Sequence, residues 1–409
     1  MVVRLETGAP DAQSLVQRTQ RVDLARSIPL GVLIPLETSV LLTIMVKHFD
    51  GGPLAKGLVA AASGFGLLVS PLLTSVARRL GWRVQRLSAV VGILGSLGFA
   101  LAATGPMFAF VAGSIIGVAS RGSVIPLITV TYQRNFSRHD RGRRVGRGLA
   151  VKVAVSAVAA VAMGSLLKGN LGTWRTVVAA GVLASLAGAV CDAMMPSAPL
   201  ERVAGVRNRP WPHFHLLTID RRLRLTLGAW MLMGFGNLML LPLRVEYLAQ
   251  PKYGVNADAA KIIALTVAVP AVVRLALLPF FGSLFDRLSF FSARIVVNLL
   301  FALYVAAFFT GTSDTGLIIG AITLGVANAG GDLMWSLWVT KFAPADRVAD
   351  YMSLHTFFTG VRATLAPLLA FAVIGYLPLS TVAWLAAALM VASSLVLLPE
   401  ARAERSVTK

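Results

Sequence analysis

The chain has 409 residues, of which 56% are hydrophobic and only 14% charged, and its mean hydropathy is +0.75. A soluble globular protein carries about 25% charged residues, so this composition excludes a soluble domain and indicates an integral membrane protein. The formal charge of +20 comes from basic residues in short segments between apolar runs. That distribution is typical of membrane topology rather than of a nucleic-acid surface. The single cysteine, Cys191, excludes an intramolecular disulfide.

Twelve apolar runs have the length of about 20 residues that a helix needs to cross a hydrocarbon core. The first six cover approximately 27–47, 54–77, 86–104, 107–131, 149–168 and 175–195. The second six cover approximately 225–248, 260–285, 291–310, 316–340, 351–377 and 380–398. We therefore predict an all-α integral membrane fold with an N-terminal bundle at 1–195, a linker at 196–224 and a C-terminal bundle at 225–409. Residues 1–26 lack the pattern of a cleaved signal peptide.

Basic residues gather in the connections after the second, fourth and sixth runs. These connections hold Arg78, Arg79, Arg83 and Arg86, then the segment 134–147, then the segment 202–224. The positive-inside bias predicts that they face the cytoplasm, together with both termini. We expect a multi-pass protein of a bacterial-type cytoplasmic membrane, whose basic loop at 132–144 contacts anionic lipid.

Two distant segments align when the chain is shifted against itself by 208 residues. This offset places Pro71–Leu80 over Pro279–Leu288 and Gly117–Ser120 over Gly325–Asn328. A single offset that aligns two segments indicates a duplicated chain. Paired membrane repeats are the architecture of alternating-access transporters.

A short motif marks the end of the eighth run. Gly282-Ser-Leu-Phe-Asp286-Arg287 resembles the Gly-x-Leu-x-Asp-Arg signature of the major facilitator superfamily, found between helices two and three and often repeated between eight and nine. The resemblance implies two pseudo-symmetric six-helix bundles, transport rather than enzymatic activity, no cofactor beyond a proton gradient, and a monomer. In the first half the acid position holds Arg78, while Gly81 and Arg83 remain. We therefore expect the acid-dependent gate at Asp286, within a gating set of Asp286, Arg287, Gly282, Arg78, Gly81 and Arg83.

Glu37 lies near the middle of the first run. A charge at the centre of a bilayer costs at least about 2.5 kcal/mol unless it is paired or hydrated, and a protonated carboxyl is cheaper to bury than a carboxylate. Glu37 is thus either a proton carrier or one partner of a structural salt bridge. Arg121, in the inner half of the fourth run, resembles the fourth-helix Arg of the superfamily's proton antiporters. The sequence favours Glu37 with Arg121 as a functional pair.

Further charges fall in the second half. Asp332 is either a second proton carrier or the neutralising partner of Arg274 or Arg362. Arg244 aligns with Glu37 when Leu-Pro-Leu-Arg is laid over Ile-Pro-Leu-Glu, whereas hydropathy places it near the outer end of the seventh run, and both placements stay open. Two further residues line a cavity or serve only in packing: Asn328 and Trp335.

The sequence favours a secondary transporter with a small-molecule substrate. Core cations outnumber core acids, which favours an anionic or zwitterionic solute; the alternative is proton-driven efflux of lipophilic compounds. Two other classes stay open: a membrane enzyme built around His139-Asp140, which lacks a nucleophile, and a sensor that no longer cycles, which the inverted charge at Arg78 allows. His213 and His215 have no ligand partners at metal-binding spacing, so no metal site is expected.

Overall fold

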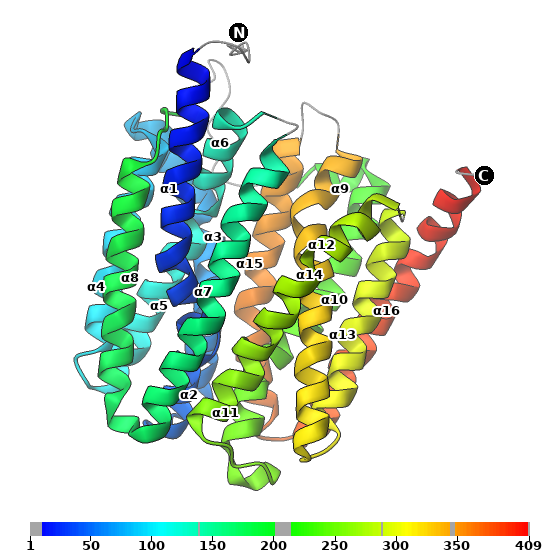
Figure 1. Cartoon of the computed structure of the whole chain (residues 1–409). Coiled ribbons are helices and arrows are strands. Elements are labelled where there is room, and N and C mark those ends of the chain that lie inside the picture. Colours follow the sequence, from blue (N-terminus) through cyan, green and yellow to red (C-terminus); the bar gives the residue numbers. More distant parts are fainter. Residues whose placement is uncertain (1–9, 138–139, 201–213, 288, 344–347, 408–409) are drawn as a thin grey trace.

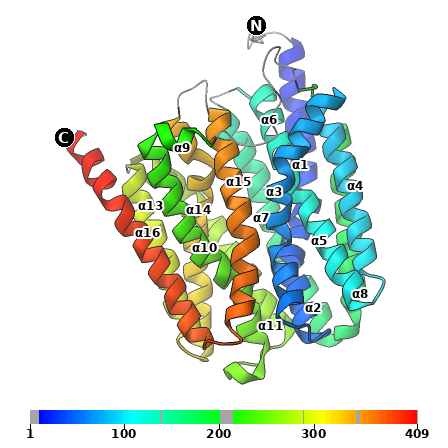
Figure 2. The ribbon, with the colours of Figure 1, turned by 180° about the vertical axis from the view of Figure 1, so that it is seen from behind.

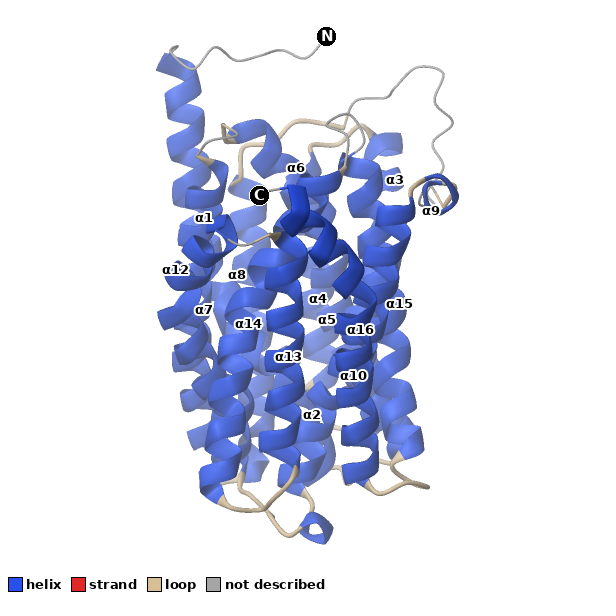
Figure 3. Ribbon diagram, turned by 90° about the vertical axis from the view of Figure 1, so that its right-hand side faces the viewer, coloured by secondary structure: helices blue, strands red, loops and turns tan. Residues whose placement is uncertain are grey.

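The computed structural model describes residues 10–137, 140–200, 214–287, 289–343 and 348–407. Within these ranges the side chains of 10–12, 282–283, 285–287, 333, 336–342, 348–350 and 405–407 are not described. The described residues form helices and no β-strand (Figure 3).

The first half of the chain begins with one long, broken helix. Its parts are α1 (Pro10–Pro35), a π-helical turn η1 (Leu36–Val40) and α2 (Leu41–Lys47). The helices that follow are α3 (Pro53–Leu80), α4 (Val84–Ala102), α5 (Met107–Ser123), α6 (Ile125–Asn135), α7 (Arg141–Gly169), the 3-10 turn η2 (Leu171–Thr173) and α8 (Trp174–Met194).

The second half repeats a broken helix at a different place. It holds α9 (Leu216–Ile219), α10 (Arg221–Ala249), the 3-10 turn η3 (Pro251–Tyr253), α11 (Ala259–Ile263), a π-helical turn η4 (Ala264–Ala268) and α12 (Val269–Arg287). The remaining helices are α13 (Phe290–Phe309), α14 (Asp314–Phe342), α15 (Val348–Val373) and α16 (Leu379–Val407).

The membrane fold predicted from the apolar runs is confirmed. Within the described residues, eleven helices are long and apolar enough to cross a membrane. The 29-residue α14 covers the expected run 316–340 and packs against α12 and α13. Large apolar side chains that remain exposed, such as Leu97, Val158 and Leu183, lie on the surface that lipid would cover.

Two boundaries differ from those expected. The first span covers Gln13–Lys47 rather than 27–47, because the charged residues that end the apolar run are buried inside the bundle and the helix continues through them. The segment 196–224, expected to be a linker, contains α9 and the first turn of α10, where the side chain of Asp220 caps the helix by accepting from the Leu223 amide.

The helices pack in two groups, which we call the N-terminal half (residues 10–200) and the C-terminal half (214–407). The halves meet where α3 lies along α15 and where α7 lies along α11 and α12 (Figures 1 and 2). Both described chain ends lie at the same end of the bundle as the connections after α3 and α6 (Figure 1). We call this end the basic face and the other end the opposite face.

Polar contacts join the two halves near the opposite face. Lys56 Nζ lies 2.9 Å from Glu246 Oε2, and both side chains are almost fully buried. Deeper in the bundle the hydroxyls of Ser39 and Thr266 lie 2.7 Å apart, which links the two π-helical turns. At the rim, Lys47 donates to Asn256 and Lys168 pairs with Asp258.

Candidate substrate and proton site

A cavity of about 270 Å³ lies between the halves. Both halves contribute polar side chains to its wall, among them Glu37 and Ser156 from the N-terminal half and Arg244, Arg274 and Asn328 from the C-terminal half. A cavity at the interface of two repeats is the place where transporters of this architecture bind solute.

Glu37 reaches this cavity from the π-helical turn η1. Pro35, immediately before the turn, has no N–H to donate to the preceding helical turn, which loosens the ladder there. Turns of this kind are frequent at functional sites because they re-aim side chains. The break turns the Glu37 carboxylate toward the space between the halves.

Glu37 and Arg121 are brought together. Arg121 Nε lies 2.9 Å from Glu37 Oε1, yet no described group donates an aligned hydrogen bond to that oxygen. Arg121 Nη1 donates instead to the Leu30 carbonyl at 3.3 Å. The contact is therefore an electrostatic pair whose carboxylate still has room to accept a proton.

Arg244 is the second charge in the interdomain cavity, which it lines together with Glu37, although it lies only five residues before the end of α10. It is 4% exposed, and no described carboxylate forms an ion pair with it. Its guanidinium donates to the Leu241 and Thr266 carbonyls, both at 3.3 Å, and lies 5.9 Å from the centre of the Tyr304 ring. The Thr266 carbonyl is accessible because Pro270, four residues later, has no N–H to donate to it.

Arg274 is neutralised by Asp332. The two side chains approach to 2.5 Å between Arg274 Nη2 and Asp332 Oδ2. Asn328 lies one helical turn before Asp332 on α14 and lines the same cavity as Arg274. Of the two partners that the sequence left open for Asp332, the structure places it against Arg274.

Arg362 lies elsewhere, in the core of the C-terminal half. Its guanidinium donates to the Trp230 carbonyl and, at 3.2 Å, to Thr359 Oγ1. Trp335 packs its ring 5.6 Å from that of His355 rather than on the interdomain cavity. These residues belong to a packed cluster in the C-terminal half, in which Arg294 stacks on Trp230 with 3.7 Å to the ring centroid.

The expected gating residues lie at the basic face. Gly81 ends α3 with a φ of +63°, a left-handed conformation that favours glycine, and Arg78 lies in the last turn of that helix. Arg83 forms an isolated antiparallel bridge with Pro199. Three more members, Gly282, Asp286 and Arg287, fall in the last turns of α12, and their side chains lie outside the described residues, so the latch stays a prediction.

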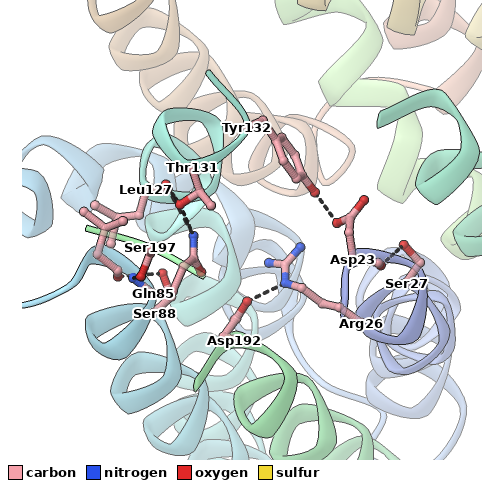
Figure 4. A network of polar contacts seen from close by, with 11 residues as sticks. Asp23, Arg26, Ser27, Gln85, Ser88, Leu127, Thr131, Tyr132, Asp192 and Ser197 are labelled. Atoms are coloured by element: carbon pink, nitrogen blue, oxygen red, sulfur yellow. Dashed lines mark hydrogen bonds and ion pairs between the residues drawn. The ribbon is translucent and has the colours of Figure 1, made fainter. Parts of the chain in front are cut away.

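Sequence reasoning missed a buried polar network in the N-terminal half. Arg26 Nε donates to Asp192 Oδ1 at 2.5 Å, and Tyr132 donates to Asp23 (Figure 4). Asp23 and Arg26 lie on the same side of α1, three residues apart, just before the apolar run that predicts the first span. The signal was present in this helical spacing, because charged residues three apart share one helix face.

Lys152 is a further missed residue. It lies about three turns into α7 and lines a second cavity together with Glu37, Arg121, Arg26 and Asp192. The long basic stretch that precedes it obscured this lysine, since it resembles the continuation of a cytoplasmic loop. Three cations of the N-terminal half therefore line this cavity: Arg26, Arg121 and Lys152.

Asp140, considered with His139 as the nucleus of an enzyme site, lies in the connection before α7. Arg143 donates to its carboxylate at 2.7 Å, and this hydrogen bond holds the pKa of Asp140 below its usual value. A carboxylate held in its charged form by two following arginines stabilises the start of a helix. His139 lies outside the described residues.

Solved structures of transporters share the fold of this chain. A point mutant of the nucleoside transporter NupG superposes with a TM-score of 0.72 at 14% identity, over 94% of this chain and 99% of its own. A D-xylose-proton symporter superposes with 0.67 at 14% identity, over 94% and 97%. The inward-open xylose transporter XylE from E. coli superposes with 0.68 at 14% identity, over 95% and 96%.

A search of curated proteins gives no match. The sequence profile of the Major Facilitator Superfamily matches residues 36–314, which is more than half of the chain. The predicted resemblance is confirmed, as is the prediction of a transporter rather than an enzyme. The chain belongs to the major facilitator superfamily.

Proposed function

We propose that this chain is a proton-coupled secondary transporter of a small anionic solute, which it moves by alternating access. The observation that carries the proposal is Arg244. It is a buried guanidinium without a described acidic partner, and it lines the cavity between the halves. An uncompensated buried charge is expensive, and a bound carboxylate or phosphate would supply the missing counter-charge.

The other charges in the cavity are balanced. Arg274 is paired with Asp332, and Arg121 with Glu37. One cation is thus left over, which favours an anion over neutral solutes such as the nucleoside and xylose of the structural neighbours. It also counts against a lipophilic cation, which Arg244 would repel.

Glu37 supplies the coupling. A proton on its carboxylate removes the one negative charge that the described residues place on the wall of the interdomain cavity, so that an anion beside Arg244 meets less repulsion. Proton binding therefore raises anion affinity, and anion binding raises proton affinity by the same factor. A solute and a proton that bind together also move together when the halves rock. The neighbour described as a D-xylose-proton symporter shows that this fold can host such coupling.

The substrate class is tested by thermal shift of the purified protein. The panel contains mono- and dicarboxylates and sugar phosphates, with xylose and uridine as neutral comparisons. A ligand at a hundred times its Kd stabilises the folded protein by about 2.7 kcal/mol, so anions should raise the melting temperature and the neutral solutes should not.

Arg244→Gln is the diagnostic variant of that screen. A hydrogen bond to a charged group contributes about 1.5–3 kcal/mol, so anion affinity should fall roughly ten- to a hundredfold. Arg244→Lys retains the charge and should lose less. Stabilisation by xylose or uridine alone, unchanged in Arg244→Gln, would show that the solute is neutral.

Proton coupling is tested in proteoliposomes with the anion that gives the largest shift. Glu37→Gln should abolish uptake driven by a pH gradient, because no proton can bind, while exchange of labelled for unlabelled solute continues. Gradient-driven uptake at the wild-type rate in Glu37→Gln would assign coupling to another residue, with Asp332 the next candidate.

A further inference from the structure

Glu37 stands between two cavities. The first lies between the halves and holds Arg244 and Arg274. The second, of about 290 Å³, is lined by side chains of the N-terminal half alone and reaches from Glu37 to the Arg26–Asp192 pair. We call this second cavity the N-half branch.

The N-half branch runs toward the basic face. Arg26 precedes Glu37 by 11 residues on the same long helix, which corresponds to about 16 Å at the helical rise of 1.5 Å per residue. Asp192 lies within the last turn of α8, and the end of that helix is at the basic face. The cavity therefore spans the distance from the middle of the bundle to within one helical turn of that face.

Charged side chains interrupt the largely apolar wall of the N-half branch. Five charged side chains line it, from four helices: Arg26, Glu37, Arg121, Lys152 and Asp192. These groups offer hydrogen-bond partners to water, and at about 30 Å³ per molecule the volume has room for roughly ten waters. The cavity is open beside Gly188, which lines it. A Cβ added to this glycine would lie 3.7 Å from the nearest side-chain atom, so it would meet no close contact.

We propose that the N-half branch is an aqueous path that carries protons between the basic face and Glu37, separate from the route of the solute. A hydronium ion in the branch gives its proton to the Glu37 carboxylate and leaves as water, and the reverse step releases the proton. The charged groups that face Glu37 during this step are Arg121 from α5, Lys152 from α7, and Arg244 and Arg274 across the interdomain cavity. The proposal rests on Glu37 as the proton site of the proposed function.

The separation of the two cavities gives protons a route to Glu37 that the solute does not occupy. The branch is lined by one half alone, so it does not open together with the solute route, and coupling requires it to be closed while the interdomain cavity is open to the opposite face. A solute in the interdomain cavity also leaves it clear. Asp192 holds Arg26 at its mouth, so that pair is expected to position the waters at the entrance.

Access of water is tested with cysteines in a Cys191→Ser background, using the water-soluble thiol reagent 2-sulfonatoethyl methanethiosulfonate. Ser120→Cys and Ser185→Cys place a thiol on the branch, and both replacements are nearly isosteric. Ser114→Cys is the matched control, because Ser114 is buried on the same helix as Ser120 and does not line the branch. The branch thiols should react at least about tenfold faster, since a thiolate forms only where water reaches it.

A larger side chain that blocks the branch distinguishes this path from other routes to the thiol. Gly188→Leu should slow the reaction at Ser120→Cys strongly, whereas Gly188→Ala, whose Cβ meets no close contact, should leave it near the parent rate. Ser120→Cys as slow as Ser114→Cys would show that the branch is dry. An unchanged rate in Gly188→Leu would show that reagent arrives by another route. Either result overturns the proposal.

Delivery to Glu37 is tested by infrared spectroscopy in deuterated buffer. The carboxyl band is assigned by its loss in Glu37→Gln, and Asn328→Trp fills the interdomain cavity so that the branch is the remaining access. In that background Gly188→Leu should slow deuterium exchange of the band, and Gly188→Ala should not. Equal exchange in the two variants would refute the path while leaving the transport result for Glu37→Gln intact, so the two proposals fail separately.

Discussion

At the scale of single residues, the cavity is defined by how each guanidinium is compensated. Arg121 has Glu37 and Arg274 has Asp332, whereas Arg244 has two long hydrogen bonds to carbonyls and the Tyr304 ring. A ring contact of this kind contributes about 0.5–2 kcal/mol, less than the several kcal/mol that a buried charge costs. This deficit is what makes Arg244 the expected anchor of an anion.

Variants of the Arg274–Asp332 pair can distinguish a structural role of Asp332 from a role in proton coupling. Asp332→Asn leaves Arg274 without its partner. Because the two side chains are 22% and 37% exposed, water partly solvates the unpaired guanidinium. The free energy of unfolding should therefore fall by nearer ~1 kcal/mol than the ~3–5 kcal/mol of a fully buried pair. Arg274→Gln/Asp332→Asn should recover the melting temperature of the purified protein. If Asp332 carried protons, the double variant would regain stability without regaining gradient-driven uptake, which separates the two roles.

At the scale of elements, the contact of α3 with α15 joins the halves most closely. A Cβ on Gly64 would lie 2.5 Å from backbone atoms of Ala363 and Thr364, so the two helices touch through their backbones. Gly57 on the same helix is less tightly packed, because a Cβ there would lie 3.1 Å from a Leu368 side-chain methyl and 3.3 Å from the Leu368 Cα. A methyl group can shift, whereas a helix backbone cannot do so without moving the helix.

Gly64→Ala should therefore force α3 and α15 apart, and Gly57→Ala should separate them much less. The measurement is labelling of Thr266→Cys, in a Cys191→Ser background, by a membrane-impermeant maleimide added from the opposite face. Labelling should rise in Gly64→Ala and should rise much less in Gly57→Ala. Equal labelling in both would mean that this contact does not hold the two halves closed.

The spans were predictable from sequence because burial in lipid selects long apolar runs, and the 208-residue offset indicated their repetition. The start of the first helix was not predictable in this way. Hydropathy treats Asp23 and Arg26 as the end of a span, whereas the bundle buries both against Asp192 and Tyr132. Tertiary partners decide whether a charge ends a helix, and a single sequence does not contain them.

The candidate site was predictable to the extent that embedded charges are conspicuous. Glu37 and Arg121 stand alone in apolar runs, and the structure brings them into contact. Lys152 and Glu246 were missed because each lies beside other charged residues and resembles part of a loop or helix end. The π-helical turns could not be predicted from the sequence either, because their register depends on Pro35 and Pro270 together with the facing half.

At the scale of the whole molecule, the described polar contacts between the halves gather toward the opposite face. Lys56–Glu246, Ser39–Thr266 and Lys47–Asn256 all lie between mid-bundle and that end. Alternating access requires such contacts to break when the cavity opens to that side. The Lys56–Glu246 pair is the most buried of them. Its loss should therefore shift the equilibrium between the closed and open states more than the loss of a contact at the rim.

Glu246→Gln should shift the molecule toward the state open to the opposite face. Removing one partner of a buried pair costs about 3–5 kcal/mol, and only the closed state contains the pair, so the equilibrium should move by more than about tenfold. Impermeant maleimide should then label Ser39→Cys, in a Cys191→Ser background, faster than in the parent. Lys47→Gln, which loses only an exposed hydrogen bond, is the matched control.

Lys56→Gln/Glu246→Gln leaves no unpaired charge. It should open the face less than Glu246→Gln alone, because part of the effect of the single variant comes from the unpaired Lys56 ammonium. Labelling of Ser39→Cys at the parent rate in Glu246→Gln would place the closing contact elsewhere on α3 and α15.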